Sequence, residues 1–298
     1  MNYSDERFAD LQLLRYRLNG FEQLSLSQKV LVYYLSKATL FGRDITFDQF
    51  GKYNLRIRKM LETVYTDLRI PHDTDEFRAL EIYLKRVWFS NGIYHHYGCE
   101  KFIPAFTADY LRQVLNMVDA TRLPLRSGQT VEGLCEELFP VIFNPDILPK
   151  RVNKADGQDL VATSACNFYD NVTQQEAEDY YRQQKVMAEG DEQPVSYGLN
   201  STLVKDDRGI HEEVWSADGR YANAIRHIVY WLEKAKDVAE KAKDSAGDFV
   251  DKAKDTAENL VDKAKDAAEN VADKAKDITD DVVDKAKDLT EKAKDAID

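Results

Sequence analysis

The sequence has little cysteine and no long apolar run, and these two absences exclude several classes of protein. Its three cysteines, Cys99, Cys135 and Cys166, show no paired spacing, which argues against a disulfide framework and favours reduced thiols. The longest apolar run covers only residues 30–35, far short of the roughly 20 residues that cross a bilayer. Residues 1–16 lack a basic stretch followed by an apolar run, so we expect no signal peptide and a cytoplasmic protein.

Positive charge is also scarce. The chain carries 41 Lys and Arg against 53 Asp and Glu, a formal net charge of −12. Because proteins bind nucleic acids through lysine and arginine contacts to phosphates, this balance argues against a nucleic-acid partner.

The short motifs that mark common active sites are missing as well. The sequence contains no G-x-S-x-G, no P-loop and no G-x-G-x-x-G. Its only His-Glu pair is His211-Glu212, and Trp215 and Ser216 stand where a second zinc-binding histidine would be. We interpret the pair as a chance dipeptide and expect no cofactor or metal in this chain.

The composition changes after Leu232. Before this position the sequence is mixed and rich in tyrosine and phenylalanine, whereas residues 233–298 are almost entirely Lys, Asp, Glu, Ala and Val. The block KAKD begins at Lys234, Lys241, Lys252, Lys263, Lys274, Lys285 and Lys292. An eleven-residue repeat fills three turns at about 3.67 residues per turn, which gives a nearly straight apolar stripe. We therefore divide the chain into residues 1–232 and 233–298, the latter a long amphipathic helix.

This tail resembles group 3 late-embryogenesis-abundant repeats. The resemblance implies a helix that forms on a membrane surface or on drying, with its lysines beside lipid. The alternative is a solvated single helix that acts as a spacer, because the apolar face is mostly alanine and the net charge is negative. Self-association into a right-handed coiled coil is a further alternative.

The pattern of the first 232 residues predicts mostly helices and one β-hairpin. N-capping residues followed by helical apolar spacing mark several helix starts. These starts are Ser25 with Gln28, Asp73 or Thr74, Thr107, and Thr173 with Glu176. Alternation on both sides of residues 206–209 predicts a β-hairpin between residues 195 and 215. We expect an α+β fold that is predominantly helical.

A last helix is expected across the composition change, over residues 221–236. Its apolar residues recur at helical spacing and predict one buried face. They are Ala224, Ile225, Ile228, Val229 and Leu232.

Residues 90–107 hold the densest cluster of functional residue types. Asn91-Gly92 and Tyr97-Gly98 signal turns, so His95 and His96 are expected on a loop between helices. Such a loop can supply ligand contacts from a rigid frame. The alternative is a packed interhelical loop whose aromatic side chains fill the core.

Several stretches resemble the N-terminal part of the dipeptidyl peptidase III family of zinc metallopeptidases, in its bacterial branch. The stretches that carry the resemblance are FADLQLLRY (8–16), GFEQLSLSQKVLVYYLSKATLFGRDITFDQ (20–49), VWFSNGIYHHYGCEKFIP (87–104), LFPVIFNPDILPKRVN (138–153), VTQQEAEDYY (172–181) and PVSYGLNSTLVK (194–205). The resemblance implies part of the lower lobe of an enzyme that removes dipeptides from the amino terminus of oligopeptides. It also implies that His96, Tyr97 and Gly98 contact the peptide, with Asn91 and Gly92 shaping the turn.

The departures from this family concern catalysis. The family's zinc helix, of the form His-Glu-x-x-x-His, is absent from the 298 residues, and so is the segment that stabilises its transition state. Without a metal to polarise the carbonyl and activate water, the main source of rate enhancement is missing. We therefore expect a catalytically incomplete lobe that binds oligopeptides weakly, or, as the alternative, a non-enzymatic stress-protection or membrane-surface protein that acts through its tail.

The expectation about catalysis is testable with a dipeptidyl-arylamide substrate. The chain should release no arylamine above background with or without added Zn²⁺, since no zinc helix is present to activate water. Release that depends on Zn²⁺ would show that the expectation is wrong.

Overall fold

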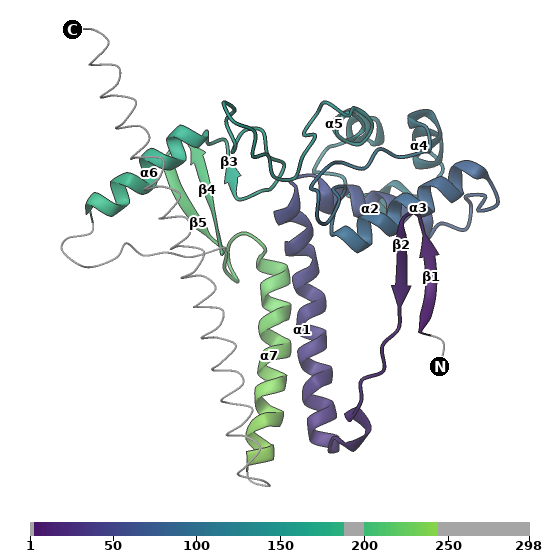
Figure 1. Cartoon of the computed structure of the whole chain (residues 1–298), viewed down its shortest axis with the longest axis vertical. Coiled ribbons are helices and arrows are strands. Elements are labelled where there is room, and N and C mark those ends of the chain that lie inside the picture. The colour runs from purple at the N-terminus through teal and green to yellow at the C-terminus, as the bar shows by residue number, and fades with distance from the viewer. Residues whose placement is uncertain (1–2, 188–199, 244–298) are drawn as a thin grey trace. The chain divides into compact units, whose positions relative to one another are not determined.

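The computed structural model describes residues 3–187 and 200–243. The chain divides into two units, residues 1–234 and 235–298, and the fold described here is that of the first. Within the described residues it is α+β and predominantly helical, as the sequence predicts (Figure 1). The predicted tail helix lies outside the described residues from residue 244 onward.

Four helices surround the main core. They are α2 (Asn54–Tyr65), α3 (Asp75–Ser90), α4 (Ala108–Leu115) and α5 (Val131–Phe143), with the 3-10 turn η2 (Ala120–Arg122) between α4 and α5. Thr74, Thr107 and Thr130 each accept a hydrogen bond from the backbone three residues on, so polar caps set where α3, α4 and α5 begin. Fully buried side chains such as Leu61, Leu84 and Leu138 fill the space between the helices.

A small sheet stands beside this core. Strand β4 (Ser201–Asp206) pairs antiparallel with β5 (Gly209–Val214) through a two-residue turn, which confirms the predicted hairpin over the residues described. The short strand β3 (Tyr169–Asp170) joins β4 in parallel. Helix α6 (Gln174–Met187) covers the sheet through a second cluster around Val172 and Leu203. A separate hairpin, β1 (Ser4–Phe8) and β2 (Leu11–Leu14), lies near the start of the chain.

Helix α1 (Leu26–Phe50) begins at the predicted capping box, in which Ser25 and Gln28 bond each other's backbone reciprocally. Helix α7 (Ala222–Lys243) begins in the first unit, and its residues 222–234 lie beside α1, as Figure 1 shows. The ring centroids of Tyr34 and Trp231 are 5.7 Å apart, and Phe41 stacks on His227 at 4.6 Å. None of the helices in the described part of the chain has the length and apolar character needed to cross a membrane.

The predicted buried face of α7 is only partly covered. Ile225 and Ile228 are half-buried, whereas Val229 and Leu232 remain 43% and 45% exposed. The prediction is wrong for these two residues because α1 covers only one side of the helix. Helix α1 is likewise apolar around much of its circumference, and Val32, Tyr33, Leu35 and Leu40 are exposed. A helix that is apolar all round is normally buried, so this pair of helices presents an unusual amount of apolar surface.

The exposed surface of α1 and α7 should bind an apolar dye or cause self-association. We expect Leu35→Gln combined with Val229→Gln to reduce dye fluorescence, because both changes lower the apolar area in contact with water. Leu68→Gln is the matched control, since Leu68 is exposed elsewhere. A wild-type chain that is monodisperse and binds no dye would contradict this interpretation of the surface.

Candidate functional site

The five residues that the sequence singles out all lie on the loop between α3 and α4, which we call the 90–107 loop. Asn91 ends α3 in the left-handed conformation, with φ of 53°. Gly92 follows with φ of 151°. A Cβ at Gly92 would lie 2.1 Å from Nδ2 of the buried Asn54, so only glycine fits here. Asn54 Oδ1 accepts from the backbone N–H of Ile93 at 3.2 Å. Asn91 and Gly92 therefore shape the turn as expected.

The base of the loop is a packed structure. Phe102 N–H donates to the Ile93 carbonyl at 2.8 Å, and His95 N–H donates to that of Glu100 at 2.7 Å. Ile93, Tyr94 and Phe102 are buried in the main core. The base of the loop therefore fills the core, as the second interpretation of the sequence predicts, whereas Tyr97 at its tip faces solvent.

The tip is formed by His95 to Cys99. Tyr97 is 85% exposed, whereas its own N–H and that of Gly98 donate to Nδ1 of His95 at 3.2 and 3.0 Å. The Gly98 side of the tip is open to solvent, but its amide proton already has a partner. Because Nδ1 accepts twice, the proton of a neutral His95 ring is on Nε2.

His96 lies in an aromatic cluster beside the tip. Its ring stacks on His95 at 4.4 Å and also contacts Tyr97 and the edge of Phe89. Burial, together with the charge of His95, lowers the pKa of His96, while Asp10 opposes this change. A lowered pKa favours the neutral imidazole, which can accept or donate a hydrogen bond near neutral pH.

Two basic residues that the sequence interpretation missed hold this loop in place. Arg151 Nη2 lies 3.4 Å from the His96 carbonyl and 3.5 Å from Cys99 Sγ, and the guanidinium sits 4.4 Å over the Phe50 ring. Lys101 Nζ donates to the carbonyls of Val141, Asn144 and Ile147. These partners are 40 or more positions away in the sequence, so no local spacing could have indicated them.

None of the five predicted residues lines either of two cavities found among the described residues. The larger, of about 680 Å³, lies between the end of α2, Trp88 and the segment after η2. The smaller, of about 390 Å³, is lined by Lys52, Leu148, Asp170 and their neighbours. Tyr94, in the 90–107 loop, donates to the Leu148 carbonyl at 3.0 Å. Because Leu148 also lines the smaller cavity, this hydrogen bond links the loop to the cavity wall.

Metal ligands do not converge in the described part of the chain. No group of three or more His, Cys, Asp or Glu side chains there is placed to hold a metal ion. His211 lies on β5, in the predicted hairpin, and contacts Arg208.

Comparison with known proteins gives no match: no family model matches the chain, and no curated protein does.

The double acceptance by His95 predicts that its ring holds the tip in shape. Removal of the ring in His95→Ala takes away the acceptor of both amides, two hydrogen bonds of about 1 kcal/mol each. In this variant we expect the Gly98 amide resonance to move toward the position of an unbonded amide, with Gly128 on a separate turn as reference. His95→Asp keeps an oxygen acceptor for the amides two and three residues on, so its Gly98 resonance should stay close to that of the wild type. An identical shift in both variants would contradict this role of His95.

Proposed function

We propose that residues 1–232 are a peptide-binding lobe of the dipeptidyl peptidase III type, which binds oligopeptides weakly at the tip of the 90–107 loop. The observation that carries the proposal is the 85% exposure of Tyr97 at the end of a loop whose base is packed into the core. A tyrosine held away from the core in this way offers a rigid amphipathic surface at low entropic cost.

The neighbours of Tyr97 supply chemistry suited to a peptide. The His96 ring lies 4.4 Å from the Tyr97 ring and extends the aromatic surface. A peptide side chain can stack on this surface, while polar groups of the peptide backbone meet the neutral imidazole of His96. Asn91 and Gly92 contribute by fixing the direction of the loop rather than by contact.

The proposal assigns binding without hydrolysis. The sequence of 298 residues contains no His-Glu-x-x-x-His segment, and the activation of water that such a segment supports has no substitute in the loop. The alternative function, stress protection or membrane-surface binding, depends on the amphipathic repeat at residues 233–298, of which residues 244–298 lie outside the described residues.

Binding should depend on the Tyr97 ring. The probe is a fluorescently labelled alanine hexapeptide in which one internal residue is phenylalanine, and the full chain should bind it weakly. Tyr97→Ala should lower the affinity for this peptide by about three- to tenfold, the range of one aromatic contact. Fluorescence anisotropy measures the affinity, and the melting temperature checks that the fold is retained.

Tyr16→Ala is the matched control, because Tyr16 is also highly exposed, at 77%, and lies outside the loop. Equal loss of affinity in both variants would show that the peptide binds to exposed aromatic side chains in general, and the proposal would fail.

A further inference from the structure

The larger cavity, of about 680 Å³, falls in the size range of small-molecule sites. Its lining combines an apolar part, Tyr65, Trp88, Leu123 and Pro124, with the charged side chains of Lys59, Glu62 and Arg122. The cavity is separate from the 90–107 loop, so an inference about it does not rest on the proposed function.

The apolar wall of this cavity is held in a fixed orientation. The indole Nε1–H of Trp88 donates to Glu62 Oε1 at 2.8 Å, and the Trp88 ring meets Tyr65 edge-on at 5.7 Å. Because both ends of the indole are constrained, its exposed part forms a flat surface that a second ring can cover without losing side-chain entropy.

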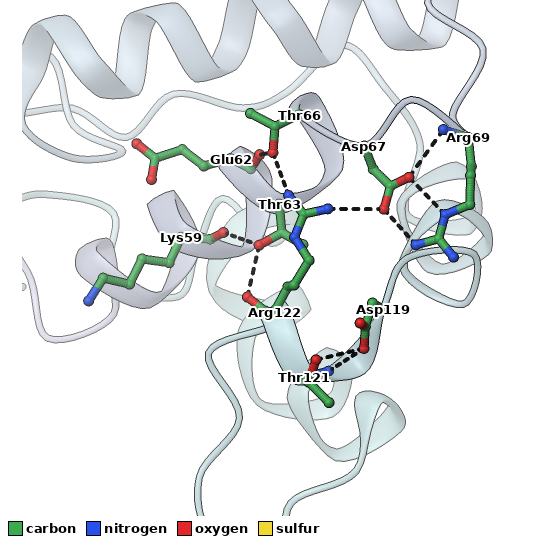
Figure 2. Close-up of polar contacts among 9 residues, drawn as sticks. All are labelled: Lys59, Glu62, Thr63, Thr66, Asp67, Arg69, Asp119, Thr121 and Arg122. Atoms are coloured by element: carbon green, nitrogen blue, oxygen red, sulfur yellow. Dashed lines mark hydrogen bonds and ion pairs between the residues drawn. The ribbon is translucent and has the colours of Figure 1, made fainter.

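Arg122 is likewise anchored, as Figure 2 shows. Its Nη2 donates to Thr66 Oγ1 at 2.8 Å, and its Nη1 lies 3.3 Å from Asp67 Oδ2. A guanidinium has five N–H donors, so three of them have no partner among the residues that the structure describes. These two contacts fix the orientation of the planar guanidinium and leave three of its N–H donors for a ligand.

The charge of Arg122 is only partly compensated. Asp67 is buried and already bound by Arg69, with Nε at 2.8 Å and Nη2 at 2.6 Å. The hydrogen bonds from Arg69, supported by Arg122, hold the pKa of Asp67 well below its usual range. Because Arg69 provides most of the hydrogen bonds to the Asp67 carboxylate, Arg122 can also bind the carboxylate of a ligand.

The remaining charges on the lining favour an anion over a cation. Glu62 is bound by Trp88 and lies 3.4 Å from Arg58 Nε, so its charge is compensated by its neighbours. Lys59 is about half-exposed, and its acidic partner among the described residues, Asp44 at 3.3 Å, also binds Arg58 at 2.7 Å. In Figure 2 the Lys59 side chain points away from the hydrogen bonds drawn around Thr63 and Arg122.

We propose that this cavity binds an aromatic carboxylate, with the ring on Trp88 and the carboxylate on the free donors of Arg122. A guanidinium recognises a carboxylate through two parallel hydrogen bonds, and Lys59 adds a second positive charge at the rim. The carboxylate can belong to a free aromatic acid or to the C-terminal aromatic residue of a peptide, since both present the same two groups.

The test uses the full chain and titration calorimetry with matched ligands. N-acetyl-phenylalanine should bind roughly tenfold or more tightly than its neutral amide, since a hydrogen bond to a charged group contributes about 1.5–3 kcal/mol. A tetrapeptide that ends in phenylalanine, with a free or an amidated C-terminus, distinguishes the two sources: tighter binding of the free peptide than of the acetylated amino acid indicates a peptide terminus. No binding at millimolar ligand, or equal binding of acid and amide, overturns the proposal.

Two variants localise the effect. Arg122→Gln should bring the affinities of acid and amide together, a ratio that a general loss of packing would not change. Lys59→Gln leaves Asp44 paired with Arg58, so this variant should fold normally. It should lower the affinity for the acid by about two- to fivefold, the contribution of one exposed charge. Lys154→Gln, which removes an exposed charge away from the cavity, should have no effect. Unchanged acid binding in Lys59→Gln and Arg122→Gln would place the ligand elsewhere and overturn the assignment.

Discussion

The ammonium group of Lys101 connects three parts of the chain at one point. It donates to the Val141 carbonyl in α5 and to those of Asn144 and Ile147 in the segment that follows. An ammonium has three N–H donors, and here each has a carbonyl partner. Burial lowers the pKa of Lys101, which shows that removing the charge from water opposes its ionisation. The three hydrogen bonds offset that penalty, and they fix the 90–107 loop against α5.

The contacts around Lys101 extend this constraint to the site. The neighbouring residues 148–151 contact the loop again, through Tyr94 to the Leu148 carbonyl and through Arg151 to the His96 carbonyl. On the other side, Asn54 fills the space beneath Gly92 and bonds the Ile93 amide. The loop is thus held by polar contacts to elements distant in sequence, whereas Tyr97 at its tip is exposed to solvent.

The sequence predicted those features whose causes are local. The capping boxes at Ser25 and Thr173, the turn at residues 206–209 and the turn at Asn91-Gly92 each depend on a few neighbouring residues. Their patterns can be read from spacing alone. The burial of a helix face depends instead on what packs against it, which is why the apolar spacing of α7 overstated the coverage of Val229 and Leu232.

The 90–107 loop and the larger cavity also differ in whether their residues are close together in the sequence. The loop residues stand together in the sequence, so their composition drew attention to them. The cavity brings together Lys59 and Glu62 from α2, Trp88 from α3 and Arg122 from η2, and no sequence spacing relates the α2 residues to Trp88 or to Arg122. The Arg122 guanidinium is oriented by Asp67 and Thr66, which are 55 and 56 positions away in the sequence, so no local pattern could have indicated it.

The last turn of α3 supplies one side chain to the larger cavity and another to the 90–107 loop. Trp88 faces the cavity and Tyr65, while its neighbour Phe89 meets the His96 ring at 5.0 Å. Adjacent residues on a helix project about 100° apart, so one turn can support two sites on different faces. Trp88 is restrained by Glu62 and the loop by Asn54 and Lys101, so neither site needs to move for the other to be filled. A ligand changes a distant site only when it favours one of two arrangements of the structure between them, and the contacts that restrain Trp88 share no residue with those that restrain the loop. The two sites should therefore act independently, although a single helix end supports both.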